Sequence, residues 1–162
     1  MEEERKQKWE SKASIEIAVL KAAQVWPILE DFCNFHKWFP IDTCYQVDGA
    51  SGQPGLIRYT AATTTSSSET IIKWAKEKLL MIDPIQRCLS YQVLDNNIGI
   101  KSYVGTFKVL PINGNDDHKG GCKIEWSFVC APMDGWKLED FLAYVEYCLQ
   151  FMAKKIDDAL LP

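Results

Sequence analysis

An excess of positive charge is missing from this sequence of 162 residues. Its 18 lysines and arginines are outnumbered by 22 aspartates and glutamates, and the net charge is −4. Proteins that bind nucleic acids gain much of their affinity from Lys and Arg side chains that neutralise phosphates. We therefore expect no nucleic-acid partner.

Long apolar segments are also missing. No apolar run approaches the roughly 20 residues with which a helix crosses a bilayer. The first dozen residues consist mainly of Glu, Arg and Lys, whereas a secretory signal requires an apolar core. These absences predict a protein without a membrane span that stays in the cytoplasm or the nucleus.

The residue patterns of metal and cofactor sites are absent as well. None of the six cysteines belongs to a Cys-x-x-Cys pair or to a Cys/His cluster with the spacing of a zinc site. There is no Ser–His–Asp constellation, phosphate-binding loop or dinucleotide glycine pattern. Neither His36 nor His118 has a nucleophile at a spacing that is typical of a catalytic site. We expect no metal and no cofactor. In a reducing compartment the cysteines are thiols, and several of them are small core side chains.

The composition that remains is that of a globular protein. Apolar residues make up 47% of the chain and charged residues 25%, which is ordinary for a folded domain and argues against disorder. No internal repeat or long linker divides the sequence, and its length suits one domain. We expect a charged tail over residues 1–8 and a single domain over residues 9–162.

Hydrophobic periodicity predicts the order of the elements. Helical spacing over residues 22–39, interrupted near Asn34 and stopped by Pro40, predicts two short helices. A longer helical stripe begins near Trp136, with Asp134 as its N-cap. Alternation bounded by turn residues, including the polar run 63–68, predicts seven strands, over residues 9–20, 43–47, 56–61, 69–81, 88–94, 101–110 and 122–130.

This order is typical of an α+β domain in which a curved antiparallel sheet wraps around the last helix. Such a sheet leaves space between itself and the helix, and concave apolar spaces are where small ligands bind. We expect a small apolar or amphipathic ligand. The residues predicted to bind it are Phe39, Tyr91, Phe107, Trp126, Phe128, Leu149 and Met152.

Polar residues on the inner face of the sheet are the candidates for chemistry. Strand alternation puts Glu77 on the inner face, because its neighbours Lys76 and Lys78 belong in water. If Arg58 also faces inward, it can pair with Glu77 across adjacent strands. The pair is either a structural ion pair or an anion-binding cation beside a proton-transfer carboxylate. Tyr103 shares the inner face of its own strand and is the third candidate.

Several stretches of the chain resemble a known family. They are Lys8-Trp9, Asp31-Phe32-Cys33-Asn34-Phe35-His36-Lys37, Gly55-Leu56-Ile57-Arg58-Tyr59, Trp74-Ala75-Lys76-Glu77-Lys78-Leu79, Ser102-Tyr103 and Glu125-Trp126-Ser127-Phe128. Together they are similar to plant lachrymatory-factor-synthase-like proteins, in the polyketide cyclase/dehydrase group of the START-like, birch-pollen-allergen-like superfamily. The resemblance spans nearly the whole chain and implies the helix-grip fold, in agreement with the predicted elements.

The resemblance also implies an activity. The enzyme that gives the family its name isomerises a small sulfenic acid to a thial S-oxide by proton transfer with an Arg, a Glu and a Tyr. The motifs place these roles on Arg58, Glu77 and Tyr103, as in an isomerase or a cyclase/dehydrase-like enzyme. Two stretches differ from the family pattern, Lys101-Ser102 and the Thr/Ser-rich run 63–68. Both belong near the predicted pocket mouth, where they bear on the substrate.

Other functions compatible with this fold remain open. A non-catalytic carrier for a plant lipid, hormone or secondary metabolite would need the same pocket, since fold does not dictate function. Abscisic acid receptors share the fold, but here residues 51–54 lie in the wrong loop for the receptor gate and residues 96–99 lack its latch. A partner-binding scaffold has no exposed apolar motif to recommend it. We expect a monomer or a weak homodimer.

Overall fold

Residues 8–112 and 120–162 of the chain are described by a computed structural model. Nearly all of the predicted charged tail lies outside the described residues, as do residues 113–119, between the last two predicted strands, with His118 among them. Within the described ranges, no helix is long and apolar enough to cross a membrane.

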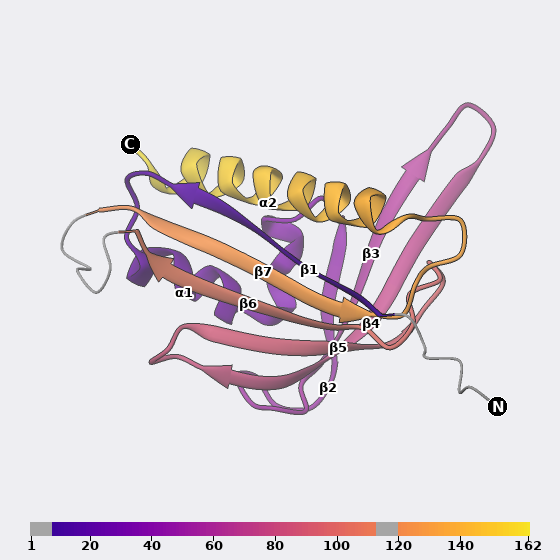
Figure 1. The fold of residues 1–162 in the computed structure, drawn as a ribbon, viewed down its shortest axis with the longest axis horizontal. Coiled ribbons are helices and arrows are strands. Elements are labelled where there is room, and N and C mark those ends of the chain that lie inside the picture. The colour runs from indigo at the N-terminus through magenta and orange to yellow at the C-terminus, as the bar shows by residue number, and fades with distance from the viewer. Residues whose placement is uncertain (1–7, 113–119) are drawn as a thin grey trace.

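Seven antiparallel strands form one curved sheet in the order β1-β7-β6-β5-β4-β3-β2 (Figure 1). Each strand from β2 to β7 pairs with its neighbour in sequence, and β1 pairs with β7. The strands are β1 (Trp9–Ile17), β2 (Thr43–Asp48), β3 (Ile57–Thr65), β4 (Thr70–Asp83), β5 (Cys88–Asn96), β6 (Val104–Pro111) and β7 (Cys122–Cys130).

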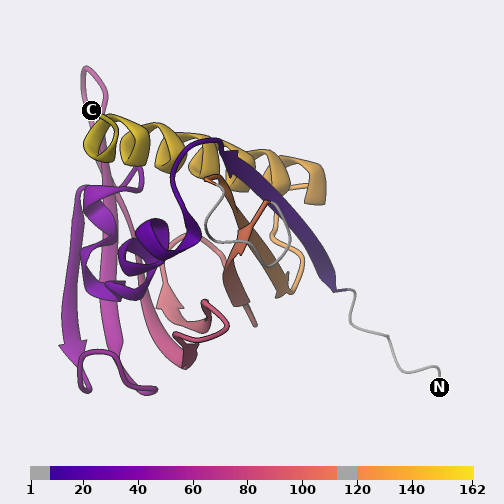
Figure 2. The same ribbon diagram turned by 90° about the vertical axis from the view of Figure 1, so that its left-hand side faces the viewer.

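Two short helices and one long helix complete the fold. The short helices, α1 (Ala22–Glu30) and η1 (Phe32–Lys37), follow β1. They are separated at Asp31, three residues before the predicted break, and the backbone leaves helical geometry again at Asn34, inside η1. The long helix α2 (Leu138–Leu160) lies across the sheet, as the two views in Figures 1 and 2 show. The prediction of an α+β helix-grip fold with a seven-stranded antiparallel sheet is confirmed.

The core lies between α2 and the inner face of the sheet. Along β7 every second side chain is buried, from Cys122 to Cys130, as strand alternation requires. On α2 the apolar stripe is buried at Phe141, Val145, Cys148, Leu149, Met152, Ala153 and Ile156. The stripe fades at both ends, because Leu138 is only half-buried and Leu160 is 43% exposed.

Three local predictions are wrong. The run 63–68 is not a turn throughout, because Thr63, Thr64 and Thr65 continue β3 and pair with β4; threonine is polar but β-branched, which suits a strand. Tyr103 precedes β6 instead of lying in it, because Ser102 has a φ of 54°, which interrupts extended backbone.

The third error concerns the start of α2. Asp134 is not its N-cap, because a turn with a hydrogen bond from Trp136 N–H to the Met133 carbonyl separates it from the helix. The helix begins at Leu138, and the Asp140 carboxylate accepts a hydrogen bond of 2.9 Å from the Lys137 N–H. Asp140 therefore satisfies a backbone donor at this end.

All six cysteines are free thiols. Cys122, Cys130 and Cys148 are almost fully buried, and this burial raises the pKa of each thiol to about 11. They stay protonated at neutral pH and act as small apolar side chains, as predicted.

Candidate functional site

A cavity of about 180 Å³ lies between the sheet and the N-terminal half of α2. Its wall is mainly aromatic and aliphatic, with few polar groups, which is the usual make-up of a small-molecule site. The residues that line it are Phe35, Phe39, Ile41, Arg58, Thr60, Ala61, Ala62, Lys73, Trp74, Ala75, Glu77, Tyr91, Val93, Ile98, Ile100, Tyr103, Trp126, Met133, Trp136, Phe141 and Tyr144.

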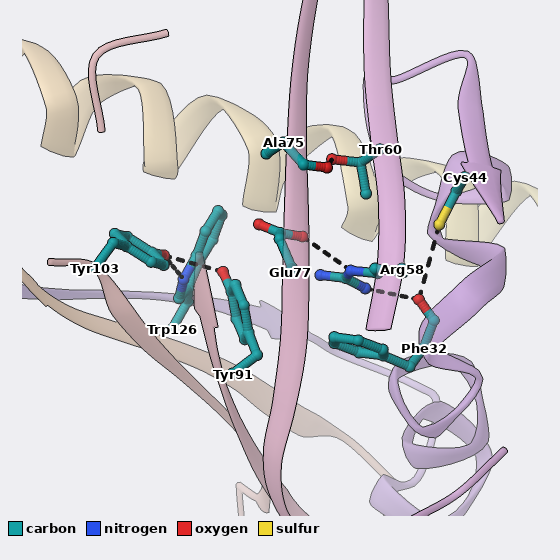
Figure 3. Close-up of polar contacts among 9 residues, drawn as sticks. All are labelled: Phe32, Cys44, Arg58, Thr60, Ala75, Glu77, Tyr91, Tyr103 and Trp126. Carbon is teal, nitrogen blue, oxygen red and sulfur yellow. Dashed lines mark hydrogen bonds and ion pairs between the residues drawn. The ribbon is translucent and has the colours of Figure 1, made fainter. Parts of the chain in front are cut away.

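The guanidinium of Arg58 is the buried charge of this wall. Arg58 on β3 lies directly opposite Glu77 on β4 in the strand register, with both side chains on the inner face. Its Nε donates a hydrogen bond of 2.8 Å to Glu77 Oε1, and its Nη1 donates one of 2.7 Å to the Phe32 carbonyl (Figure 3). The Phe32 and Phe35 rings lie 3.7 and 4.2 Å from its central carbon. These partners compensate the loss of water around a side chain that is only 3% exposed.

The carboxylate of Glu77 is engaged on one side only. Its side chain is 14% exposed, and Oε1 accepts the hydrogen bond from Arg58. The other oxygen points away from the guanidinium, to the side where Tyr103 and Trp126 lie (Figure 3). Among the described residues, none donates a hydrogen bond to that oxygen. A ligand in the cavity can therefore reach it.

Two tyrosines and a tryptophan form a hydrogen-bonded group on the same wall. The hydroxyl oxygens of Tyr91 and Tyr103 are 2.9 Å apart, and the Trp126 Nε1–H donates a hydrogen bond of 3.0 Å to Tyr103 Oη. Burial raises the pKa of both tyrosines well above its ordinary value, so both hydroxyls stay protonated. One of the two hydroxyl protons forms the hydrogen bond between the tyrosines, and the other can be donated to a ligand.

Gly105 on β6 makes room for the two tyrosine side chains. A Cβ atom at this position would lie 2.8 Å from Tyr103 Oη and 2.8 Å from Cε1 and Cζ of Tyr91. Contacts this short force a shift of the tyrosine side chains, and both are held in a packed core. Gly105 is therefore a positioning residue for the hydroxyl pair.

Gly105→Ala is expected to lower the free energy of unfolding by about 1–3 kcal/mol, the usual cost of overpacking a core. In a strand without this contact, the same change would stabilise the protein by roughly 0.5–1 kcal/mol, because alanine loses less backbone entropy on folding. Denaturant unfolding of the two proteins measures the difference. A variant as stable as the parent would show that the rings move aside freely.

Six of the ten residues predicted for the site line the cavity: Arg58, Glu77, Tyr103, Phe39, Tyr91 and Trp126. Their roles stay predictions. The other four, Phe107, Phe128, Leu149 and Met152, are buried but do not line it.

Packing explains why these four residues do not line the cavity. Phe107 stacks behind Trp126 with ring centroids 4.8 Å apart, and Phe128 packs edge-on against Phe141 at 4.8 Å. Leu149 and Met152 belong to the part of α2 that follows Tyr144, its last cavity-lining residue. These four side chains therefore belong to the packed core beside the cavity, which occupies only one part of the space beneath α2.

Sequence reasoning found Phe39 and Tyr103 but missed several other cavity-lining residues outside the strands. Ile98 and Ile100 follow β5, Trp136 precedes α2, and Tyr144 lies on α2 beside the predicted stripe. The sequence held a sign of each of these residues. Each is a large apolar side chain that lies either in a polar loop or at a helix position outside the core stripe. Trp136 and Tyr144 are 38% and 45% exposed, so they mark the side on which the cavity meets solvent.

No group of three or more His, Cys, Asp or Glu side chains that could hold a metal ion occurs within residues 8–112 and 120–162. The polar groups of the described wall include the Arg58–Glu77 ion pair, the hydroxyls of Tyr91 and Tyr103 and the indole N–H of Trp126. These groups can fix a polar atom of a ligand and move a proton to or from it.

Comparisons with known proteins agree with this fold. A family model described as polyketide cyclase / dehydrase and lipid transport matches residues 8–156. The structure of a protein called XoxI from Bacillus cereus matches with a TM-score of 0.69 and 19% sequence identity, over 94% of this chain and 95% of that one. A crystal structure of a Bacillus thuringiensis protein matches with a TM-score of 0.68 and 19% identity, over 94% and 99% of the two chains. At this identity the two structures show a shared fold alone.

Proposed function

Because this chain belongs to the polyketide cyclase/dehydrase and lipid transport family, we propose that it binds a small, mostly apolar molecule in the cavity beneath α2 and rearranges it by proton transfer. The observation that carries the proposal is the Arg58–Glu77 pair, which sets a cation beside a carboxylate in a largely apolar wall. Charged pairs of this kind in a cleft are candidates for acid–base chemistry.

Glu77 is the group that exchanges the proton. Its carboxylate oxygen on the cavity side can accept a proton from a ligand atom within hydrogen-bond reach and return it to another atom of the same ligand. Arg58 holds the other oxygen and so fixes the direction in which the carboxylate points. A ligand that fills the cavity would displace water from around the carboxylate, which keeps the proton from being lost to solvent.

Tyr103 and Tyr91 hold the oxygen atom of the ligand. Both hydroxyls are protonated, and one of their two protons can be donated to an oxygen that gains negative charge as the proton leaves. The hydrogen bond from Trp126 fixes the position of the Tyr103 hydroxyl. Such preorganised donors stabilise a transition state without reorganising during the reaction.

The substrate class that fits is a small sulfenic acid or carbonyl compound, as in lachrymatory-factor-synthase-like proteins. With an alkenyl sulfenic acid, the proton leaves the S–O–H oxygen and is added to the alkenyl carbon far from sulfur, and the carbon–carbon double bond becomes a carbon–sulfur double bond. With a carbonyl compound, the proton moves between carbon and oxygen. A cavity of about 180 Å³ suits ligands near the size of benzene, which binds in a protein cavity of about 150 Å³.

The experiment is a turnover and binding panel with the purified protein. Alkenyl sulfenic acids are generated in situ from cysteine sulfoxides by a lyase, and small carbonyl compounds are added directly. We expect product formation faster than in the protein-free control for at least one member, measured by mass spectrometry, together with binding measured by calorimetry. Binding without any acceleration across the panel would exclude the proton-transfer role. No binding at all would exclude the ligand site.

One observation favours a second function, a non-catalytic carrier. Arg58 is held by Glu77, by the Phe32 carbonyl and by two aromatic rings, so it also fastens η1 to the sheet. A pair with this purely structural task would leave the cavity as a binding site for an apolar ligand. In a carrier, Arg58→Ala would change affinity, but there would be no turnover to lose.

A further inference from the structure

A second hollow adjoins the cavity on the side of the segment that follows η1. It is a groove of about 320 Å³ near the C-terminal half of α2. Its walls mix charged and apolar groups, whereas the cavity wall is mostly apolar. The residues unique to the groove are His36, Pro40, Asp42, Thr63, Phe151 and Lys155.

Three residues line both spaces and therefore separate them: Phe39, Ile41 and Ala62. Phe39 is the largest of the three. Its ring belongs to the aromatic cluster of the cavity, with its centroid 5.2 Å from that of Phe35 and 5.5 Å from that of Trp126. The side chain is only half-buried. The Phe39 ring is thus packed against other rings on the cavity side and exposed on the groove side.

The backbone around Phe39 is fastened to β3. The Asp42 N–H donates a hydrogen bond of 3.0 Å to the Ala61 carbonyl, and the Asp42 carboxylate accepts one of 2.7 Å from the Thr63 N–H. These two bonds bracket Ala62, so they fix Asp42, the residue after Ile41, against this part of β3. The partition between cavity and groove is therefore a built feature of this loop, with the Phe39 ring as its main bulk.

We propose that Phe39 sets the length of the ligand that this protein accepts. The inference rests on the proposed function only in taking the cavity as the ligand site. A ligand longer than the cavity meets the Phe39 ring, and removing the ring joins the cavity of about 180 Å³ to the groove of about 320 Å³. The longer ligand would then place its far end among the mixed polar and apolar groups of the groove.

A homologous series of straight-chain 2-alkanones with five to thirteen carbons tests this proposal, with affinity measured by calorimetry. For the parent protein, each added methylene should raise the affinity by about fourfold while the chain still fits, and the affinity should fall once it reaches the partition. For Phe39→Ala, the chain length of highest affinity should increase by several carbons. The longest ketones should gain at least tenfold relative to the parent.

Phe151→Ala is the matched control, because Phe151 is also a half-buried phenylalanine but lines the groove alone. It should leave the preferred chain length unchanged. Phe39→Leu and Phe39→Val should give smaller shifts in the order of the volume removed, and they replace Phe39→Ala if that variant does not fold by circular dichroism.

The outcomes separate this inference from the proposed function. If the parent protein binds short ketones and the Phe39 variants keep its length preference, the partition has no role in selectivity and this inference fails alone. If neither the parent nor any Phe39 variant binds a member of the series, this inference fails, and the turnover and binding panel decides the proposed function separately. A shift equally large in Phe151→Ala would also overturn the role given to Phe39.

Discussion

Glu77→Gln is expected to lower turnover by about 100-fold or more and to leave ligand binding within a few-fold of the parent protein. Glutamine keeps the shape of the side chain and can still accept the hydrogen bond from Arg58 Nε, but it cannot take up a proton at neutral pH. Loss of a general acid–base group typically costs 10²–10⁴ in rate. The measurements are kcat on the best substrate of the panel and Kd by calorimetry.

The control for this variant is Glu125→Gln. Glu125 is similarly shielded, with its side chain 15% exposed against 14% for Glu77, and it pairs with Lys12 at 3.9 Å. It alternates with the buried residues Ile124 and Trp126 on β7, so it lies on the outer face of the sheet. We expect Glu125→Gln to retain full activity. Equal activity of Glu77→Gln and the parent across the panel, with equal binding, would remove the proton-transfer role and leave the carrier.

Leu149→Asp is expected to destabilise the fold by several kcal/mol, about 3–5. The Leu149 side chain is 1% exposed in the middle of α2 and belongs to the core between the helix and the sheet. A carboxylate there would be buried without a partner, or the helix would have to lift away to hydrate it, and both cost far more than a surface substitution. Denaturant unfolding at pH 7 measures the loss.

Leu160→Asp makes the same substitution at an exposed position of the same helix, where the parent side chain is 43% exposed. It adds a negative charge near the C-terminal end of the helix, which costs about 0.3–1 kcal/mol. Leu149→Asp should therefore lower the free energy of unfolding severalfold more than Leu160→Asp does. If Leu149→Asp were as stable as Leu160→Asp, the apolar stripe of α2 would not be part of the core.

The pairing of Arg58 with Glu77 could be predicted because it depends on local rules. Alternation assigns each residue to a face of its strand, and the charged neighbours of Glu77 leave only one choice of face. Two strands joined by one hairpin then bring both side chains to the same side of the sheet. The strand faces, the element order and the fold class all follow from such short-range patterns.

The extent of the cavity could not be predicted in this way. Phe107 and Trp126 obey the same alternation and lie beside each other, yet only Trp126 lines the cavity, because the two rings stack and one covers the other. Which ring faces open space depends on side chains from α2 and from the loop after β5. Tyr103 shows a similar limit, since the φ of Ser102 that displaces it from β6 has no signature in the sequence.

The wall of the cavity is divided between two kinds of backbone, and this division has an evolutionary consequence. Arg58, Glu77, Tyr91 and Trp126 belong to paired strands, whereas Ile98, Ile100, Met133 and Trp136 belong to connecting segments. Substitutions in connecting segments disturb no strand pairing and are tolerated more readily than changes in a core. Relatives with the same sheet can therefore diverge in the molecules they select, by mutation of these connecting segments, without disturbing the strands on which Arg58 and Glu77 lie.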